Sequence, residues 1–220
     1  NQQRYVTVNA ALYQSDLGTV MEKVKKKVNN NVSLPTGYDI EYGGQYQEMS
    51  ESFEDLGFAF LLAIVLVYMV MASQFESLVD PFVIMFTVPM AIIGVLPGLF
   101  LTGYNISVVS IIGLVMLAGI VVNNAIVLVD YINTLRAQGY SMREAILKAG
   151  PIRLRPILMT ALTTILALLP IGLGIGEGAE VQAPMAVVVI GGLTVATFLT
   201  LYAVPVLYTI YERFSRKVSD

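Results

Sequence analysis

The chain contains no cysteine and no histidine among its 220 residues. This removes disulfides, thiolate chemistry and the commonest ligands of zinc and haem iron, so we expect no metal and no cofactor. Charged residues are also scarce, at 13% against about 25% in an ordinary soluble domain. The net charge of −3 argues against a nucleic-acid partner. The pattern G-x-x-x-x-G-K-[ST] is absent, so the sequence does not support an ATP-driven process.

Long uncharged stretches dominate what is present, because 56% of the residues are hydrophobic. One stretch lies between Asp55 and Glu76. A bilayer core about 30 Å thick is crossed by about 20 helical residues at 1.5 Å each, and helices satisfy their own backbone polar groups in lipid. The uncharged stretches therefore predict five transmembrane helices, near residues 56–75, 81–101, 106–132, 154–175 and 182–211.

Lysine and arginine are distributed unevenly around these predicted spans. The loop before the fourth span and the end of the chain are basic, whereas the turns near 102–105 and 175–181 have no basic residue. The basic residues are Arg136, Arg143, Lys148, Arg153, Arg155, Arg213, Arg216 and Lys217. By the positive-inside rule we expect the tail, 215–220, to be cytoplasmic and the first segment extracytoplasmic, in a cell (inner or plasma) membrane.

The segment before the first span, 1–52, has the pattern of a small β-α-β unit. Residues 5–13 and 38–42 are rich in β-branched and aromatic side chains, and Asp16 is a plausible N-cap for a helix over 17–30. About 40 residues bury little surface alone, so we expect half of a larger subdomain, with a small independent cap as the alternative. The predicted fold is mainly α and polytopic, with this β-α-β segment followed by a five-helix membrane domain, 53–214.

Polar residues inside the third span are functional candidates, because such groups are costly in a bilayer. Asn123, Asn124 and Asp130 lie in this span or at its end, and Gly119 lies one turn before Asn123. Asn123 and Asp130 are seven residues apart and therefore share a helix face. The alternative is that the amides bond across packed helices and that Asp130 sits at the membrane interface.

Span four opens with an arginine cluster and carries several threonines. Arg153 and Thr160 are seven residues apart and share a face, which suits a basic group and a hydroxyl lining a water-accessible relay. The alternative is an arginine that snorkels to the interface and hydroxyls that bond to their own helix. Every acidic residue near the predicted spans lies at a span end, so the chain offers no obvious mid-membrane carboxylate for proton coupling.

Three runs of sequence, taken together and in order, resemble one known family. They are FESLVDPFVIMFTVPMAIIG, GLVMLAGIVVNNAIVLVDY and RLRPILMTALTTILALLP. The chain resembles the resistance-nodulation-division (RND) superfamily, in its hydrophobe/amphiphile efflux branch of acriflavine-resistance type. The match is to the last porter segment and spans eight to twelve. We therefore expect further chain upstream, including the N-terminal half of the pump, because the sequence also begins without methionine.

The resemblance implies a proton-driven antiporter that exports hydrophobic or amphiphilic compounds, works as a homotrimer in membrane lipid, and can bind a periplasmic membrane-fusion adaptor. It implies no chemical catalysis. Arg153 and Thr160 match the family's relay arginine and threonine, and Asn124 matches a family asparagine. Asn123 stands where many members have a lysine. An asparagine can hydrogen-bond a carboxylate but provides no counter-charge.

Two other functions are compatible with the residues. The membrane repeat is shared with RND relatives that export proteins or lipids, so the spans alone discriminate poorly. A short accessory membrane protein that acts through a partner chain is the second alternative. The porter-like segment leading into the first span favours efflux.

Overall fold

The computed structural model describes residues 6–12, 17–35 and 37–219, with side chains as far as residue 209. The chain divides into two compact units, Asn1–Glu54 and Asp55–Asp220. Helix α2, Gln45–Phe75, contributes its beginning to the first unit and the remainder to the second. Each unit is described by itself.

The first unit contains α1, Leu17–Asn31, and the beginning of α2. Lys25 connects the two helices, because its Nζ atom donates a 3.0 Å hydrogen bond to the Tyr46 hydroxyl. The same Nζ atom lies 4.4 Å from the centre of the Tyr46 ring and 5.3 Å from that of Tyr42. These contacts attach an otherwise polar helix that buries no residue completely.

The predicted β-α-β segment is wrong for the described residues. Residues 6–12 and 38–43 form no strand, and positions 5 and 13 of the first predicted strand lie outside the described residues. The physical reason is that β-branched composition only favours a strand, whereas a strand forms when a neighbour supplies the other half of each hydrogen-bonded ladder. Neither described segment pairs with a neighbouring strand, so local propensity alone leaves them irregular.

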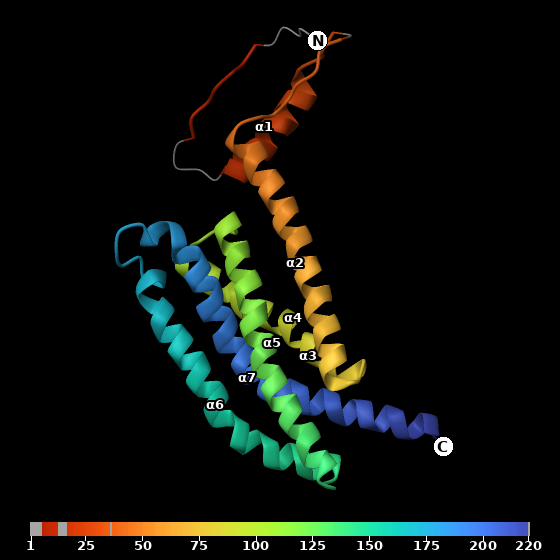
Figure 1. Cartoon of the computed structure of the whole chain (residues 1–220). Helices are drawn as coiled ribbons and strands as arrows, with labels where there is room; N and C mark the ends of the chain where they lie inside the picture. The colour runs from red at the N-terminus through yellow and green to blue at the C-terminus, as the bar shows by residue number, and fades with distance from the viewer. Residues whose placement is uncertain (1–5, 13–16, 36, 220) are drawn as a thin grey trace. The chain divides into compact units, whose positions relative to one another are not determined.

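The second unit consists of the remainder of α2 followed by five helices (Figure 1). These are α3, Val79–Met85; α4, Thr87–Thr102; α5, Val108–Ala137; α6, Met142–Gly172; and α7, Ala179–Ser219. Five segments are long and apolar enough to cross a membrane, with α3 and α4 acting as one. They are Gln45–Phe75, Val79–Thr102, Val108–Ala137, Met142–Gly172 and Ala179–Thr209. The predicted number of spans is therefore confirmed.

Two turns between these helices follow directly from local chemistry. Gly103 ends α4 in the left-handed region, at φ 73°, where a glycine has no Cβ to clash. Ser107 then starts α5 with a capping box, in which its side chain accepts from the Ser110 backbone N–H. Ser141 starts α6 in the same way with Glu144. The polar turn expected near 102–105 is therefore present.

Helix α6 begins earlier than the span predicted at 154–175. Residues 142–150 are continuous with the span, and Figure 1 shows that α6 bends in this first part. Pro151 and Pro156 lie inside the helix and remove backbone donors. Ala145 and Ala149 are completely buried in the core cluster that contains Ile132 of α5. Packing against α5 therefore holds this first part of α6 against the bundle.

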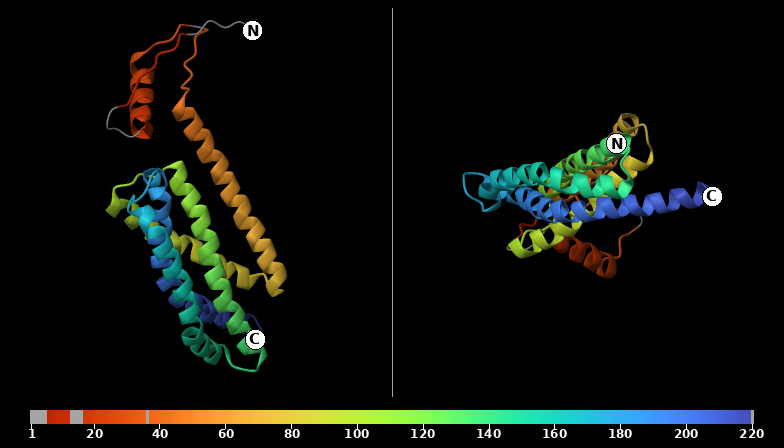
Figure 2. Two further views of the ribbon diagram at one scale, coloured as in Figure 1. Left: turned by 60° about the vertical axis from the view of Figure 1, so that its left-hand side comes forward. Right: turned by 90° about the horizontal axis from the view of Figure 1, so that it is seen from below.

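Helix α7 is the central helix of the second unit, because it packs against α4, α5 and α6 (Figure 2). Glycines lie where α7 packs against α4 and α5. A Cβ atom built on Gly94 would lie 2.4 Å from the Gly191 carbonyl oxygen, and one on Gly192 would lie 2.2 Å from Leu117 Cδ2. Only hydrogen fits at these positions, which is how small residues let membrane helices pack closely.

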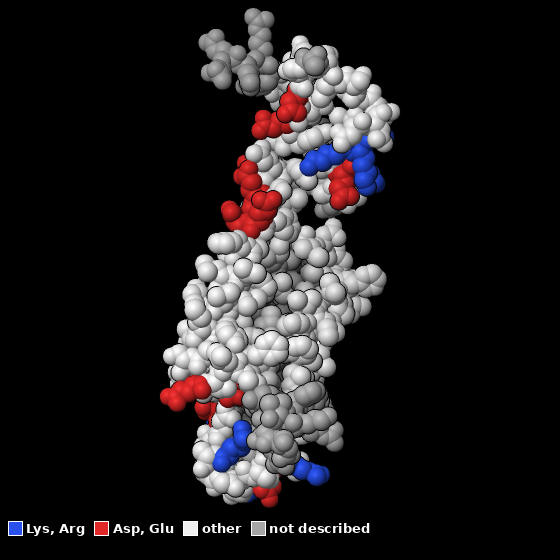
Figure 3. Space-filling view, turned by 90° about the vertical axis from the view of Figure 1, so that its right-hand side faces the viewer, with Lys and Arg blue, Asp and Glu red and all other residues white. Residues whose placement is uncertain are grey.

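Charge is confined to the ends of the membrane unit on the face shown in Figure 3, and its middle is uncharged there. Both signs gather at the lower end of that view. This distribution agrees with apolar helices whose charged residues lie at the two membrane surfaces.

Candidate functional site

The polar residues predicted on span four face α5 in the structure. Helices α5 and α6 are consecutive, antiparallel and packed together. Arg153 meets Tyr131, and Thr160 meets Asn124. Asn124 and Tyr131 are seven residues apart on α5, as are Arg153 and Thr160 on α6. The two contacts are therefore about 10 Å apart along the helices. The α5–α6 interface thus carries two polar contacts in antiparallel register, and these four residues form the candidate site.

The first contact is a hydrogen bond between helices. The Thr160 hydroxyl lies 3.3 Å from Asn124 Oδ1 and 3.0 Å from the carbonyl oxygen of Ile157 on its own helix. Asn124 is 7% exposed, whereas the side chain of Thr160 is exposed. Because one hydroxyl has one proton, it divides its donation between these two acceptors. The Asn124 amide therefore retains hydrogen-bonding capacity for a further group.

The second contact is a cation–π pair. The Arg153 guanidinium carbon lies 4.5 Å from the centre of the Tyr131 ring. Arg153 is half-buried, and its buried Nε atom has no hydrogen-bond partner among the described residues. A guanidinium over an aromatic face is stabilised by the ring quadrupole, more so when it is desolvated. Tyr131 thus fixes the guanidinium while leaving hydrogen-bond donors for an anionic or carbonyl group.

Asn123 is not part of these contacts. Its side chain is exposed, as are Gly119 and Asp130, and these three residues follow one another on the same face of α5. The structure therefore brings together Asn124, Arg153 and Thr160 among the predicted residues, and it places Asn123 on an open face. The neighbouring threonines 163 and 164 on α6 bond to carbonyl oxygens of their own helix, at 2.8 and 2.9 Å.

Sequence reasoning missed Tyr131 completely. The available signal was its spacing, because Tyr131 is seven residues after Asn124 just as Thr160 is seven residues after Arg153. Pairing the two helices as an antiparallel hairpin would have placed the ring opposite the arginine. A tyrosine near the end of a span is more often a membrane-interface anchor, which is why the residue drew no attention.

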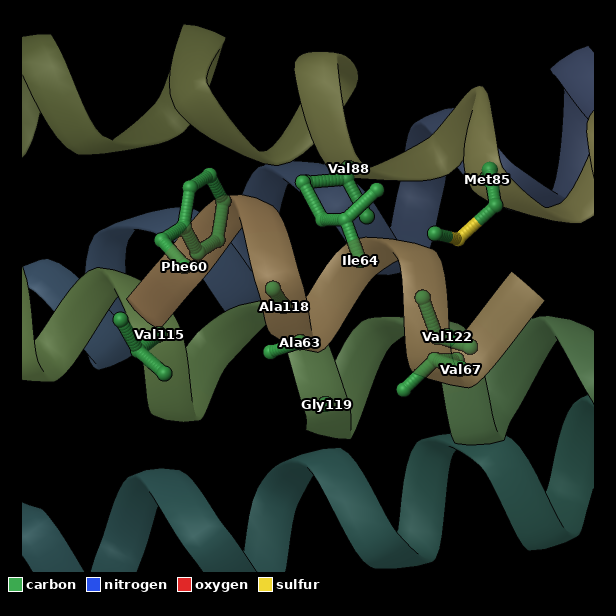
Figure 4. Close-up of a pocket in the computed structure, with 10 residues that line it drawn as sticks. All are labelled: Phe60, Ala63, Ile64, Val67, Met85, Val88, Val115, Ala118, Gly119 and Val122. Atoms are coloured by element: carbon green, nitrogen blue, oxygen red, sulfur yellow. The ribbon is translucent and has the colours of Figure 1, made fainter. Parts of the chain in front are cut away.

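An apolar cavity of about 90 Å³ lies elsewhere in the membrane unit (Figure 4). Its lining comes from α2, from α3 and α4, and from α5. These residues are Phe60, Ala63, Ile64, Val67, Met85, Val88, Val115, Ala118, Gly119 and Val122. All are apolar, so the cavity suits a hydrocarbon group and offers no side-chain donor or acceptor for a polar one.

The described residues contain no group of three or more His, Cys, Asp or Glu side chains that could hold a metal ion. The candidate site instead has one fixed cation, one buried amide and two hydroxyls, those of Thr160 and Tyr131. Such a set can bind and orient an anionic group or relay a proton through hydrogen bonds. It has no activated nucleophile of the kind that covalent catalysis uses.

The fold and the site together define a polytopic membrane protein whose polar groups are arranged between spanning helices. The model of the AcrB/AcrD/AcrF family matches residues 1–212 of the chain. The chain therefore belongs to this RND family, as the sequence motifs predicted.

Relatives with curated names support the same assignment. The chain is 42% identical over 214 residues to swarming motility protein SwrC of Bacillus subtilis, covering 97% of this chain and 20% of that protein. It is 31% identical over 220 residues to cobalt-zinc-cadmium resistance protein CzcA of Cupriavidus metallidurans, covering 100% of this chain and 21% of that protein.

A solved structure has the same arrangement of helices. The crystal structure of a heavy metal efflux pump (crystal form II) aligns with a TM-score of 0.81 and 32% identity over 91% of this chain. The aligned part is 20% of that pump, and the chain likewise spans about a fifth of the length of the curated relatives.

Proposed function

We propose that this chain supplies part of the ion relay of an RND efflux transporter that exports hydrophobic or amphiphilic compounds in exchange for protons. The contact between Arg153 and Tyr131 carries the proposal. A half-buried guanidinium with a buried, unbonded Nε atom is costly among membrane helices unless an anion also faces it. We infer that a carboxylate from chain outside these 220 residues, in the N-terminal half of the pump, provides this anion.

Thr160 and Asn124 extend the relay in this proposal. They lie in the same helix interface, about 10 Å from the Arg153–Tyr131 contact. Their hydroxyl and amide can form hydrogen bonds with the incoming carboxylate. Asn123 stands at the position where many family members have lysine. Arg153 then carries more of the electrostatic load than in those members. Asn123 contributes a neutral amide from the exposed face of α5.

Two substrate classes have support among the relatives. The relative of 42% identity is named for swarming motility, whereas relatives of 31–32% identity are named for heavy-metal resistance or efflux. We favour amphiphilic organic compounds, because the chain has no histidine or cysteine to bind a soft metal ion. The wholly apolar cavity between α2, α4 and α5 also suits a hydrocarbon group. Heavy-metal cations are the second candidate.

The assembly is inferred from the family. In the proposal the complete polypeptide is a homotrimer in a cell membrane and works with a membrane-fusion adaptor. The chain end after α7 faces the cytoplasm, because the stretch from Arg136 to Arg155 and the end of α7 are the basic regions. The first unit is then extracytoplasmic. The protein moves substrates and catalyses no chemical reaction.

The test uses the complete polypeptide encoded by the source gene, reconstituted in liposomes that contain the pH dye pyranine. An imposed pH gradient is followed before and after addition of ethidium. We expect ethidium to accelerate proton flux several-fold and Arg153→Met to abolish the acceleration. Arg155→Met is the matched control, because this exposed arginine lies two residues away on the same helix and should have little effect.

The outcomes separate the alternatives. Acceleration by Zn²⁺ but not by ethidium would assign the metal substrate class. Equal ethidium-dependent flux in wild type and Arg153→Met would refute the proposed relay. An absence of proton flux with every added compound, from protein that is folded and correctly inserted, would instead favour a protein- or lipid-exporting relative.

A further inference from the structure

A second polar cluster joins three helices at the end of the bundle where α2 and α5 finish. Asp80, near the start of α3, accepts hydrogen bonds at both carboxylate oxygens. The Nδ2–H group of Asn133 on α5 donates a 2.8 Å hydrogen bond to Oδ2, and the Tyr208 hydroxyl of α7 donates a 2.6 Å hydrogen bond to Oδ1. We call these three residues the Asp80 cluster. It was not predicted from the sequence and is not part of the candidate site.

The backbone around Asp80 is held by contacts that do not involve its carboxylate. Glu76 has φ 49°, so the chain leaves α2 through a left-handed residue that is not glycine. Ser77 Oγ then accepts from the backbone N–H groups of residues 79 and 80, at 3.3 and 3.4 Å. The Tyr68 hydroxyl of α2 donates a 2.9 Å hydrogen bond to the carbonyl oxygen of Leu78. The elbow between α2 and α3 thus presents Asp80 in one place.

The burial of the cluster makes its contacts strong. Tyr208 is completely buried, and Asp80 and Asn133 are half-buried. Hydrogen bonds to an ionised carboxylate are stronger than those between neutral groups, and a low local dielectric strengthens them further. The cluster therefore has a charge-assisted core, in which one carboxylate accepts from two partners.

The position of Asn133 on α5 connects this cluster to the candidate site. Asn124 and Asn133 are nine residues apart, which is two and a half helical turns. They therefore point to opposite sides of α5, separated by about 14 Å along its axis. Asn124 bonds to α6 on one side, and Asn133 bonds to α3 on the other. Two polar contacts on opposite faces thus resist rotation and sliding of α5.

Apolar packing alone specifies such a helix only weakly. Nearly all of α5 between its ends is apolar, and in lipid no hydrophobic difference favours one face over another. Directional hydrogen bonds are then the means by which one rotational setting is selected. We propose that Asp80 is a positioning residue, which holds α5 through Asn133 and Tyr208 in the setting where Asn124 meets Thr160. The effect of this on transport rests on the function proposed above.

The first experiment measures the setting of α5 without using transport. The 220 residues contain no cysteine, so Asn123→Cys adds a single thiol to this chain on the exposed face of α5. Cysteines elsewhere in the complete polypeptide are replaced by serine. The rate of labelling by N-ethylmaleimide then reports rotation of that face. We expect Asp80→Asn and Tyr208→Phe to change this rate by about threefold or more, the equilibrium effect of one interhelical hydrogen bond in a bilayer.

The matched controls are Thr134→Val and Thr209→Val. Each residue neighbours a cluster member, and among the described side chains its hydroxyl bonds only to a carbonyl oxygen of its own helix. These variants should label like the parent. Asp80→Glu, which retains the carboxylate, should restore part of the parental rate. Tyr208→Phe removes a single oxygen, so it keeps the test available if Asp80→Asn fails to fold.

The second experiment measures ethidium-driven proton flux in the cluster variants with Asn123 intact. A positioning role predicts a several-fold lower maximal rate with an unchanged KM for ethidium, because none of the three cluster residues lines the apolar cavity. Unchanged labelling in folded Asp80→Asn and Tyr208→Phe variants would overturn the positioning role. Altered labelling with unaltered flux would support the positioning of α5 and count against the proposed relay, so the two failures can be distinguished.

Discussion

Helices α2 and α7 have similar hydropathy in the sequence, but α2 is largely exposed in the structure and α7 is half buried. Their candidate spans are both 31 residues long, with mean hydropathy 2.5 for α2 and 2.2 for α7. Yet in an apolar stretch of 18 residues taken from each helix, 6% of the α2 stretch is buried inside the structure, against 50% of the α7 stretch. Hydropathy therefore tells which segments enter the membrane, and it does not tell which of them becomes the centre of the bundle.

Small residues account for the difference. The α7 face towards α4 and α5 carries Gly191 and Gly192. Gly94 of α4 and Gly113 of α5 also lie directly against α7. Closely apposed backbones gain many van der Waals contacts, which replace the hydrophobic driving force that is absent between helices in lipid. The part of α2 in this unit has large side chains such as Phe58, Leu61 and Val70 on its exposed surface. That surface is suited to lipid or to another part of the transporter.

The largest effect is expected from equal truncations on the two helices. Leu193 on α7 is 0% exposed and Leu61 on α2 is 61% exposed. Leu193→Ala should lower stability by about 2 kcal/mol or more, because the surrounding helices cannot close the cavity. Leu61→Ala should change it by less than about 0.5 kcal/mol. Thermal unfolding in detergent, followed by fluorescence-detected size exclusion, measures both, and equal losses would contradict the comparison.

Adding a methyl group to the glycine contact is the next test. Gly94→Ala should cost about 1–3 kcal/mol, because its Cβ would lie 2.4 Å from a backbone oxygen that cannot rotate away. Gly98→Ala is the matched control one turn later, where the nearest atoms would lie at 3.5 Å, an ordinary contact. The same thermal assay applies. A Gly94→Ala protein as stable as Gly98→Ala would mean that the helices are not packed through these glycines.

A smaller effect on stability is expected at the candidate site. Thr160→Val removes the hydroxyl that reaches Asn124 and should cost about 0.6 kcal/mol, the average for an interhelical bond in a bilayer. Thr163→Val is the control, since that hydroxyl bonds only within α6. Ethidium-driven proton flux should fall several-fold in Thr160→Val alone. Equal flux in the two variants would show that the hydroxyl has a structural role only.

The smallest effect is expected at Gly119, on the exposed face of α5. A Cβ atom there would meet nothing within 4 Å. Gly119→Ala should therefore leave the fold unchanged and raise stability by about 0.5 kcal/mol through helix propensity. A clear loss of stability would show that another part of the transporter packs closely on this face. Thermal unfolding with and without the remainder of the polypeptide distinguishes the two cases.

Much of the candidate site was predictable from spacing. Arg153 and Thr160 were placed on one face of span four, and both do face α5. The choice between Asn123 and Asn124 was not predictable, because both are amides in one apolar run and differ only by a rotation of about 100° around the helix. Packing against α6 decides it, and it buries Asn124 while leaving Asn123 exposed.

The first unit marks where local pattern failed. Residues 6–12 and 38–42 have strand-like composition and form no strand, because a ladder needs a neighbouring chain segment that composition cannot supply. The Asp80 cluster marks the opposite case, in which an ordinary charge at the end of a span acquired two partners. Asp80 and Tyr208 are 128 residues apart in sequence, and no local pattern relates them.

The sequence by itself determined the five spans, the turns between them and the family, because transfer of side chains and backbone into lipid depends on composition within about 20 residues. Only the tertiary structure decided that α7 is central, that Asn124 faces Thr160 and that Asp80 joins three helices. These features depend on which surfaces fit together at atomic distance. That fit is a property of residues far apart in the chain, and hydropathy does not encode it.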